Sequence, residues 1–289
     1  MAIQSTPSRV PRGTVTASLN FYAPPEDGSA PFNHVDPPPP GLPVRNYNTA
    51  THDVELHDIR GAEADFTNLD RDAFALIRGV PPSAEKDFTD DASITKLYYP
   101  ELEALLLKHI PGANRVIFFD HTIRRARPGA TREPVQRVHI DQTARSAALR
   151  VRRHASSPED AEHLLAHRYR IVNVWRSLNK DPIESFPLAF ASSASLEDKD
   201  VVPVEHRYAN GYTGETAGIR YDPAQRWYYA SGMTGDERLL LECFDSEALK
   251  EGSAVRGGRV AHTAFAHPDT LEDAVGRESI EVRALVFGP

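Results

Sequence analysis

Residues 135–141 read VQRVHID, and this stretch decides how the rest of the chain is interpreted. It has the composition of a short strand that ends at a carboxylate. Residues two apart on an extended strand point to the same side, so the side chains of His139 and Asp141 are expected to lie together. One imidazole and one carboxylate are two of the three ligands of the facial triad that binds Fe(II). The stretch therefore predicts part of a metal site.

The His-x-Asp pattern also occurs at residues 34–36 and 267–269, so the context has to choose among the three. The first copy lies beside four consecutive prolines, and the third has a proline between its two members. Only residues 139–141 close a strand that can hold ligands in a fixed geometry. The alternative for this copy is a histidine that pairs with a neighbouring carboxylate and binds no metal.

A second imidazole is expected from residues 259–265, RVAHTAF, which predict another short strand. His262 lies inside this strand and can complete a triad with His139 and Asp141. His267 is the alternative third ligand, because an Arg-x-Ser sequence follows it. We prefer His262, since His267 abuts a proline.

The segment at residues 276–287, which contains the last predicted strand at residues 279–287, carries Arg277 and Arg283. An even separation places both on one side of an unbroken strand. In a 2-oxoglutarate site the metal takes two oxygens of the cosubstrate, and a guanidinium farther along binds its distal carboxylate. The strand therefore predicts such a cosubstrate site. Glu281 lies on the same side, so one of the two arginines can instead be its partner.

Short strands between Gly, Pro and Asp clusters predict a mainly β fold with flanking helices, a sandwich or jelly roll. Helices are expected at residues 100–109 and after Pro158, which suits a first turn. The chain has 289 residues and 23 prolines, many of them near the N-terminus. We expect a proline-rich arm at residues 1–45, whose prolines exclude regular strand pairing. This arm can wrap the domain or meet a second subunit in a homodimer. Residues 46–289 are expected to form a single domain.

The formal net charge of −8 argues against nucleic-acid binding, which requires clustered Lys and Arg. The single cysteine, Cys243, excludes an intrachain disulfide and a cysteine-rich zinc site. No apolar stretch approaches the roughly 20 residues that span a bilayer, and the N-terminus is too polar for a signal peptide. We therefore expect a cytoplasmic protein whose partner is a small molecule rather than a nucleic acid or a membrane.

Taken together, six motifs make the chain resemble, over roughly residues 45–287, the fungal hydroxylase/desaturase family typified by AsaB and the gibberellin desaturase. The resemblance implies a non-haem Fe(II)/2-oxoglutarate-dependent dioxygenase on a double-stranded β-helix, with O2 as the second cosubstrate. It further implies hydroxylation or desaturation of a small molecule in natural-product biosynthesis. The motifs are VHIDQ at 138–142, VWRSL at 174–178, RWYY at 226–229, DS at 245–246, HTAF at 262–265 and RESIEVR at 277–283.

By this resemblance His139, Asp141 and His262 match the iron ligands. The arginine pair is also similar to the Arg-x5-Arg of AlkB-type demethylases. That likeness implies that Arg277 holds the distal carboxylate of 2-oxoglutarate and Arg283 its metal-bound end, although the reverse assignment stays open.

Further residues in the family-like segments are candidates for the substrate cavity, and for the aromatic ones core packing is the alternative. Two other functions also stay open. One is a cupin-like jelly-roll protein that binds a small molecule without catalysis, and the other is a metal-dependent hydrolase or isomerase. The candidate substrate residues are Arg124, Trp175, Arg176, Trp227 and Tyr229.

Overall fold

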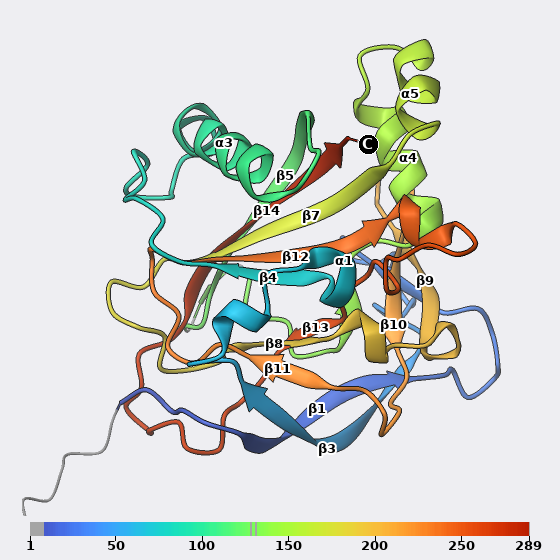
Figure 1. Cartoon of the computed structure of the whole chain (residues 1–289). Coiled ribbons are helices and arrows are strands. Elements are labelled where there is room, and N and C mark those ends of the chain that lie inside the picture. The colour runs from blue at the N-terminus through green and yellow to red at the C-terminus, as the bar shows by residue number, and fades with distance from the viewer. Residues whose placement is uncertain (1–8, 128, 131, 289) are drawn as a thin grey trace, which may run out of the picture.

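The computed structural model describes residues 9–127, 129–130 and 132–288, whose strands form two stacked sheets (Figure 1). The larger sheet contains, in spatial order, β1 (Val15–Ala23), β3 (Asn48–Asp58), β11 (Trp227–Tyr229), β8 (Leu188–Ala191), β13 (His262–Ala264), β6 (His139–Ile140), β10 (Thr213–Ile219), β9 (Val201–Arg207) and β2 (Phe32–His34). The smaller sheet contains β4 (Phe74–Ile77), β12 (Arg238–Asp245), β7 (Tyr169–Ser177), β14 (Glu278–Phe287) and β5 (Arg115–Arg125). The smaller sheet is antiparallel throughout.

The helices lie outside the two sheets. Leu102 and Leu106 of α3 pack against Val172 and Val282 on the outer face of the smaller sheet. Residues 99–109 and 158–165 are helical, which confirms the two predicted helices, and Ser157 Oγ caps the second by accepting from Asp160 N at 3.1 Å. The helices are α1 (Leu69–Asp72), α2 (Asp91–Ser93), the π-helical turn η2 (Ile94–Tyr98), α3 (Tyr99–His109), α4 (Ala144–His154) and α5 (Pro158–Leu165), with short 3-10 turns at Glu63–Asp65, Ser193–Ser195, Asp198–Asp200 and Ser246–Leu249.

The main core lies between the two sheets. Ile140 and Trp227 of the larger sheet belong to the same buried cluster as Ile171 and Leu285 of the smaller one. Neighbouring residues of a strand face opposite sides, so Ile171 enters this core while Val172 faces the helices. Two packed sheets with helices outside are the jelly-roll architecture that the strand pattern predicted. No helix in the described part of the chain is long and apolar enough to cross a membrane.

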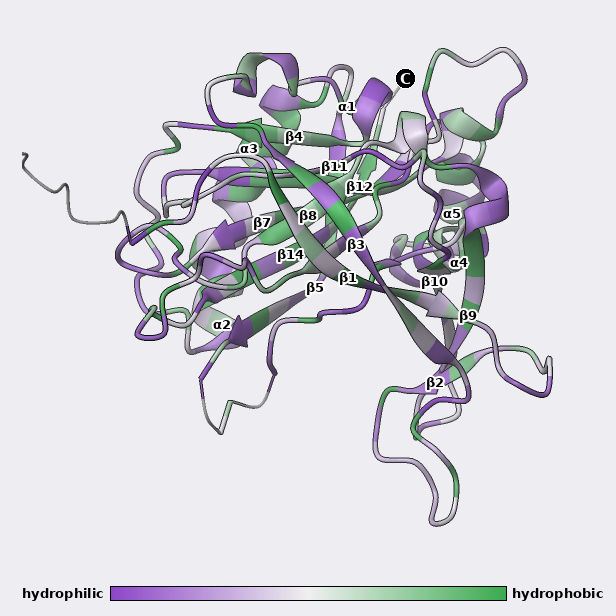
Figure 2. Cartoon of the chain, turned by 90° about the horizontal axis from the view of Figure 1, so that it is seen from below, coloured by the Kyte–Doolittle hydropathy of each residue, from purple (hydrophilic) through white to green (hydrophobic). Residues whose placement is uncertain are grey.

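The N-terminal segment was expected to lack regular pairing, and this is wrong for two stretches. β1 pairs with β3 over its whole length, and β2 pairs in parallel with β9. The prolines at 24–25, 31 and 37–40 flank these strands and do not interrupt them. Along β1, hydrophobic and hydrophilic residues alternate (Figure 2), so one face is buried. Residues of the first 45 therefore belong to the sheet that carries the predicted metal ligands.

We expect Phe21→Ala to lower the free energy of unfolding by about 3–5 kcal/mol, because it empties a buried aromatic site. Phe21 is 0% exposed, and its ring lies edge-on to Trp227 at 5.8 Å between centroids. Urea denaturation measures the change. Thr16→Ala on the exposed side of the same strand is the control and should stay within about 0.5 kcal/mol. Equal effects of the two substitutions would contradict a structural role for β1.

Candidate metal centre

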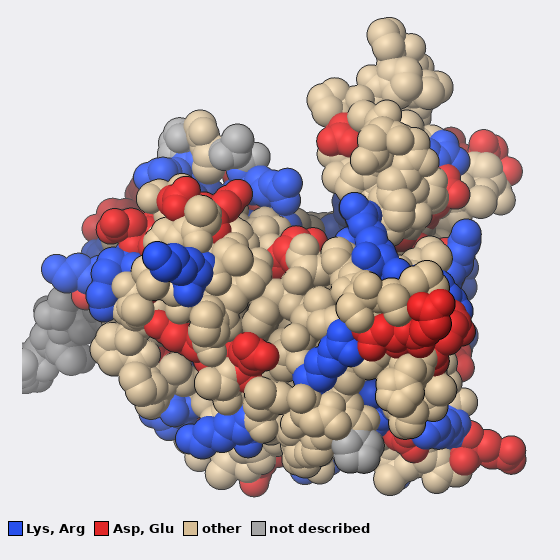
Figure 3. All heavy atoms as spheres, turned by 90° about the horizontal axis from the view of Figure 1, so that it is seen from above, with Lys and Arg blue, Asp and Glu red and all other residues tan. Residues whose placement is uncertain are grey.

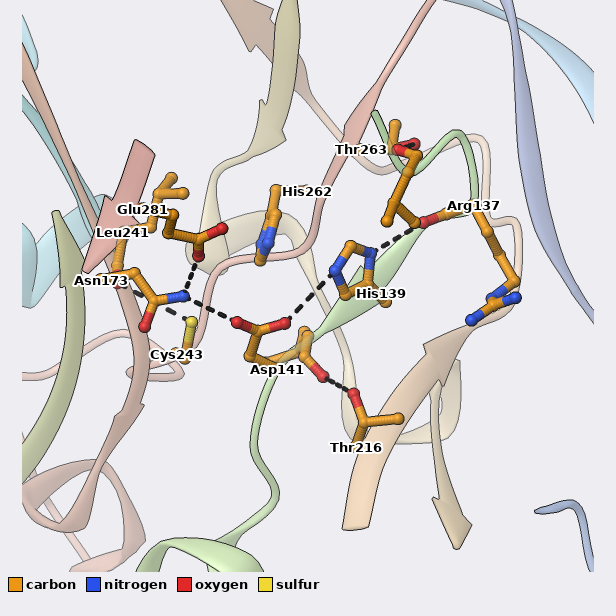
Figure 4. A network of polar contacts seen from close by, with 12 residues as sticks. Arg137, His139, Asp141, Asn173, Thr216, Leu241, Cys243, His262, Thr263 and Glu281 are labelled. Atoms are coloured by element: carbon orange, nitrogen blue, oxygen red, sulfur yellow. Dashed lines mark hydrogen bonds and ion pairs between the residues drawn. The ribbon is translucent and has the colours of Figure 1, made fainter. Parts of the chain in front are cut away.

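Two neighbouring strands place the predicted histidines opposite each other. β13 pairs antiparallel with β6, and His262 is the direct partner of His139 in this register. Their ring centroids are 4.4 Å apart, and Asp141 follows directly after β6. One ligand atom from each of the three side chains lies within 4.8 Å of the others. Figure 4 shows the three side chains pointing toward one another.

Backbone carbonyls orient both imidazoles. Nδ1 of His139 lies 2.8 Å from the Arg137 carbonyl oxygen, and Nδ1 of His262 lies 3.3 Å from that of Val260. A carbonyl only accepts, so each Nδ1 donates and each Nε2 keeps its lone pair. Burial lowers the pKa of His262 to about 4 and holds this ring in its neutral form. Both histidines therefore present a metal-binding nitrogen.

Asp141 is held from the side away from the histidines. Its Oδ2 accepts from Asn173 Nδ2 at 2.8 Å and from Arg283 Nε at 2.7 Å. Its Oδ1 faces His139 Nε2 at 3.3 Å. Burial raises the pKa of Asp141, but the charge of Arg283 outweighs it and holds the pKa well below its usual range. The carboxylate is therefore charged and has one oxygen free for a metal.

Arg283 is surrounded by acceptors of the protein. Besides Asp141, it donates from Nη1 to Asp120 Oδ1 at 3.0 Å and to Thr122 Oγ1 at 3.1 Å, and Glu281 lies 3.6 Å from Nη2. Burial lowers its pKa, yet the three carboxylates outweigh this and raise it well above the ordinary value. Arg283 therefore fixes the orientation of the triad carboxylate.

Arg277 has a different environment. It is 1% exposed, and Nη1 donates to the Phe186 carbonyl oxygen at 2.6 Å. Among the described residues its Nε has no hydrogen-bond partner, and no carboxylate lies within ion-pair distance. Burial, and then the charge of Arg124, lower its pKa to about 9. Its guanidinium lies 5.5 Å from the Trp175 ring. Glu281 lines the same small cavity as Arg277, but Arg277 has no carboxylate at ion-pair distance among the described residues.

Only some of the predicted substrate residues lie beside the triad. Arg124 and Trp175 line a small cavity that they share with Arg277 and the two histidines of the triad. Arg176 lies on the opposite face of the sheet, because strand neighbours alternate, and its guanidinium is 5.0 Å from the Phe88 ring. Arg176 therefore does not face the triad.

Trp227 and Tyr229 belong to the hydrophobic core of the larger sheet. The hydroxyl of Tyr229 donates to the Gly13 carbonyl oxygen at 2.7 Å and lies 3.2 Å from His267 Nε2. On its other side, His267 Nδ1 accepts from Asp269 N at 3.2 Å. Both ring nitrogens of His267 are thus engaged away from the triad, and the geometry selects His262 as the third member.

Asn173 is a site residue that the sequence reasoning missed. Its side-chain amide donates to Asp141 and also to Glu281. A usable signal was present, because Asn173 lies two residues before Trp175 on β7 and so faces the same side. It is a fully buried amide in an otherwise apolar stretch, which calls for a polar partner across the core.

Comparison with known proteins finds relatives that match most of the chain. A family model described as an oxidoreductase/YMDC permease-like domain matches residues 19–287. A hydroxylase/desaturase, PoxK of Penicillium oxalicum, is 37% identical over 302 residues, which cover 96% of this chain and 92% of the relative. An Fe(II)/2-oxoglutarate-dependent dioxygenase, NvfI of Aspergillus novofumigatus, is 34% identical over 256 residues, which cover 87% of this chain and 88% of that protein.

A solved structure agrees with these matches. The iron and alpha-ketoglutarate-dependent endoperoxidase NvfI superimposes with a TM-score of 0.84 at 29% identity. The superposition covers 96% of this chain and 99% of that one. The fold, the converging His-Asp-His set and the full-length relatives all agree with the resemblance seen in the motifs. The chain therefore belongs to the family of fungal hydroxylase/desaturases and Fe(II)/2-oxoglutarate-dependent dioxygenases.

Proposed function

We propose that this protein is an Fe(II)/2-oxoglutarate-dependent dioxygenase that hydroxylates or desaturates a small molecule in natural-product biosynthesis. The observation that carries the proposal is the convergence of His139, Asp141 and His262 within 4.8 Å. Two imidazoles and one carboxylate oxygen on one side of a metal are the donor set of non-haem Fe(II) oxygenases. When bound, Fe(II) with 2-oxoglutarate and O2 supplies the oxidising power for the reaction.

Each residue of the centre then has a distinct role. His139, Asp141 and His262 bind the metal, with their orientation set by the two backbone carbonyls and by Arg283. Arg277 binds the distal carboxylate of 2-oxoglutarate. This assignment is supported by its burial without an anionic partner, since a buried charge requires compensation. The protein's own contribution is to hold the substrate so that one C–H bond faces the metal.

The substrate enters through a larger cavity of about 660 Å³ that borders His139 and Asp141. Cavities of roughly 300–1,000 Å³ suit small organic molecules. Hydroxylation and desaturation both begin by removing a hydrogen atom, so the placement of the substrate in this cavity decides between them. A homodimer and a cytoplasmic location stay predictions from the sequence.

We expect anaerobic Fe(II) and 2-oxoglutarate to give the weak visible absorption band of the bound pair, and O2 with substrate to release succinate. Asp141→Ala should abolish the band because it removes a metal ligand. Asp36→Ala and Asp269→Ala change the other two His-x-Asp copies and should leave it intact. Folded protein that shows neither the band nor succinate would refute the oxygenase function. A cupin-like binding protein would instead keep its ligand affinity in the Asp141 variant.

Asn173→Ala should weaken Fe(II) binding by about 10–100-fold, because it removes a hydrogen bond that orients a metal ligand. The affinity is measured by anaerobic titration. Asn179→Ala is the matched control, since Asn179 donates to the Gly276 carbonyl oxygen away from the triad. An unchanged affinity in the Asn173 variant would show that Arg283 alone suffices to hold Asp141.

Substitutions of Arg277 and Arg283 should weaken the binding of different ligands. Arg277→Gln is expected to raise the dissociation constant of 2-oxoglutarate by about 10–100-fold and to leave Fe(II) affinity unchanged, since it removes only a carboxylate partner. Arg283→Gln should weaken Fe(II) binding itself, because Asp141 loses its charged partner. Both constants are measured on the same preparations. The opposite pattern would exchange the two roles.

A further inference from the structure

The large cavity beside the triad has an unusual charge balance. Its acidic lining residues are Asp120 and Asp141, and Arg283 is bound to both. Further arginines line the same cavity without a carboxylate at ion-pair distance within the described parts of the chain. These arginines are Arg124, Arg132, Arg137 and Arg150. The lining therefore carries an excess of positive charge.

This excess contrasts with the protein as a whole, whose formal net charge is −8. On the outer face seen from above, basic and acidic side chains are interspersed (Figure 3). A cavity lined mainly by charges of one sign concentrates ligands of the opposite charge. The balance thus points to an anion inside the cavity.

Three of the four arginines, Arg124, Arg137 and Arg150, are half-buried. Arg137 is half-buried, with its guanidinium 5.4 Å from the Tyr47 ring, and Arg45 lies 5.7 Å from that ring. Arg124 is half-buried, and its Nη1 donates to the Glu133 carbonyl oxygen at 3.1 Å. Burial lowers the pKa of both guanidinium groups. Aromatic rings and carbonyls stabilise a cation only in part, so both would gain from an anionic partner.

Arg124 and Arg137 both line the cavity that borders His139 and Asp141. Arg137 lies two residues before His139, and its carbonyl orients that imidazole. Arg124 lines both the large cavity and the small one that contains Arg277. An anionic group bound between Arg124 and Arg137 would leave the remainder of the same molecule beside the triad.

The cavity also offers uncharged polar contacts. Nε2 of His34 and Nε2 of His206 are buried, line the cavity and have no hydrogen-bond partner among the described residues. Burial lowers the pKa of His206 to about 4, so this ring serves as a neutral hydrogen-bonding group. Tyr47 and Tyr208 add aromatic surface. A molecule with one anionic group and a partly polar body matches this lining.

We propose that the substrate is an organic anion whose carboxylate or phosphate is bound by Arg137 and Arg124. The reaction of this substrate rests on the proposed function, whereas the binding of the anion does not. The cosubstrate 2-oxoglutarate is itself an anion, so the test has to occupy its site separately.

The probes are hexanoate, hexyl phosphate and neutral methyl hexanoate, titrated calorimetrically into the protein with anaerobic Fe(II) and N-oxalylglycine, an unreactive analogue of 2-oxoglutarate. We expect the better of the two anions to bind at least about tenfold more tightly than the ester. Arg137→Gln and Arg124→Gln should each remove most of this preference and leave ester binding unchanged. Comparison of the two anions identifies the preferred group.

Arg152→Gln is the matched control, because it removes the same charge from an exposed position on α4, where Arg152 pairs with Glu162. The Arg152 variant should keep the preference for the anions over the ester. Equal binding of anions and ester refutes the proposal, as does an equal loss in the Arg152 variant or displacement of the anions by N-oxalylglycine. Ester binding verifies that each variant is folded. The titration is repeated without iron, so a failed oxygenase function leaves the anion preference measurable.

Discussion

The ion pair between Asp141 and Arg283 connects the two sheets at the metal centre. Asp141 follows β6 in the larger sheet, while Arg283 and Asn173 come from β14 and β7 in the smaller one. Removing one member of a buried pair leaves an unpaired charge, which costs far more than the pair contributes. The orientation of the metal-binding carboxylate thus depends on how the two halves of the jelly roll pack.

The arginines of the site differ in what surrounds them, and this difference separates their roles. Arg283 is surrounded by carboxylates, so it belongs to the framework of the site. Arg277 and the cavity arginines lack such partners among the described residues, so they are available to ligands. In a protein with a net negative charge, several arginines that have no carboxylate at ion-pair distance among the described residues line the cavities beside the triad. Charge complementarity of this kind favours both the capture and the orientation of anions.

Strand alternation explains which neighbours of the site take part in it. On β7, Asn173 and Trp175 face the triad, whereas Arg176 faces the helices that cover the other side of the sheet. The sequence motif contained Trp175 and Arg176 together, and a motif does not say which of two adjacent residues points inward. Because strand neighbours alternate, the contacts of one residue have to be known before the facing side of the next can be assigned.

The sequence by itself determined the properties that depend on near neighbours in the chain. These are the shared face of His139 and Asp141, the start of α5 at Ser157 and Pro158, and the alternating strands that build a jelly roll. Only the tertiary structure decided the relations between distant strands. The register of β13 on β6 brings His262 rather than His267 next to His139, and sheet packing gives Arg277 and Arg283 different surroundings. Hydrogen bonds between strands set that register, and a single sequence does not specify which strands will meet.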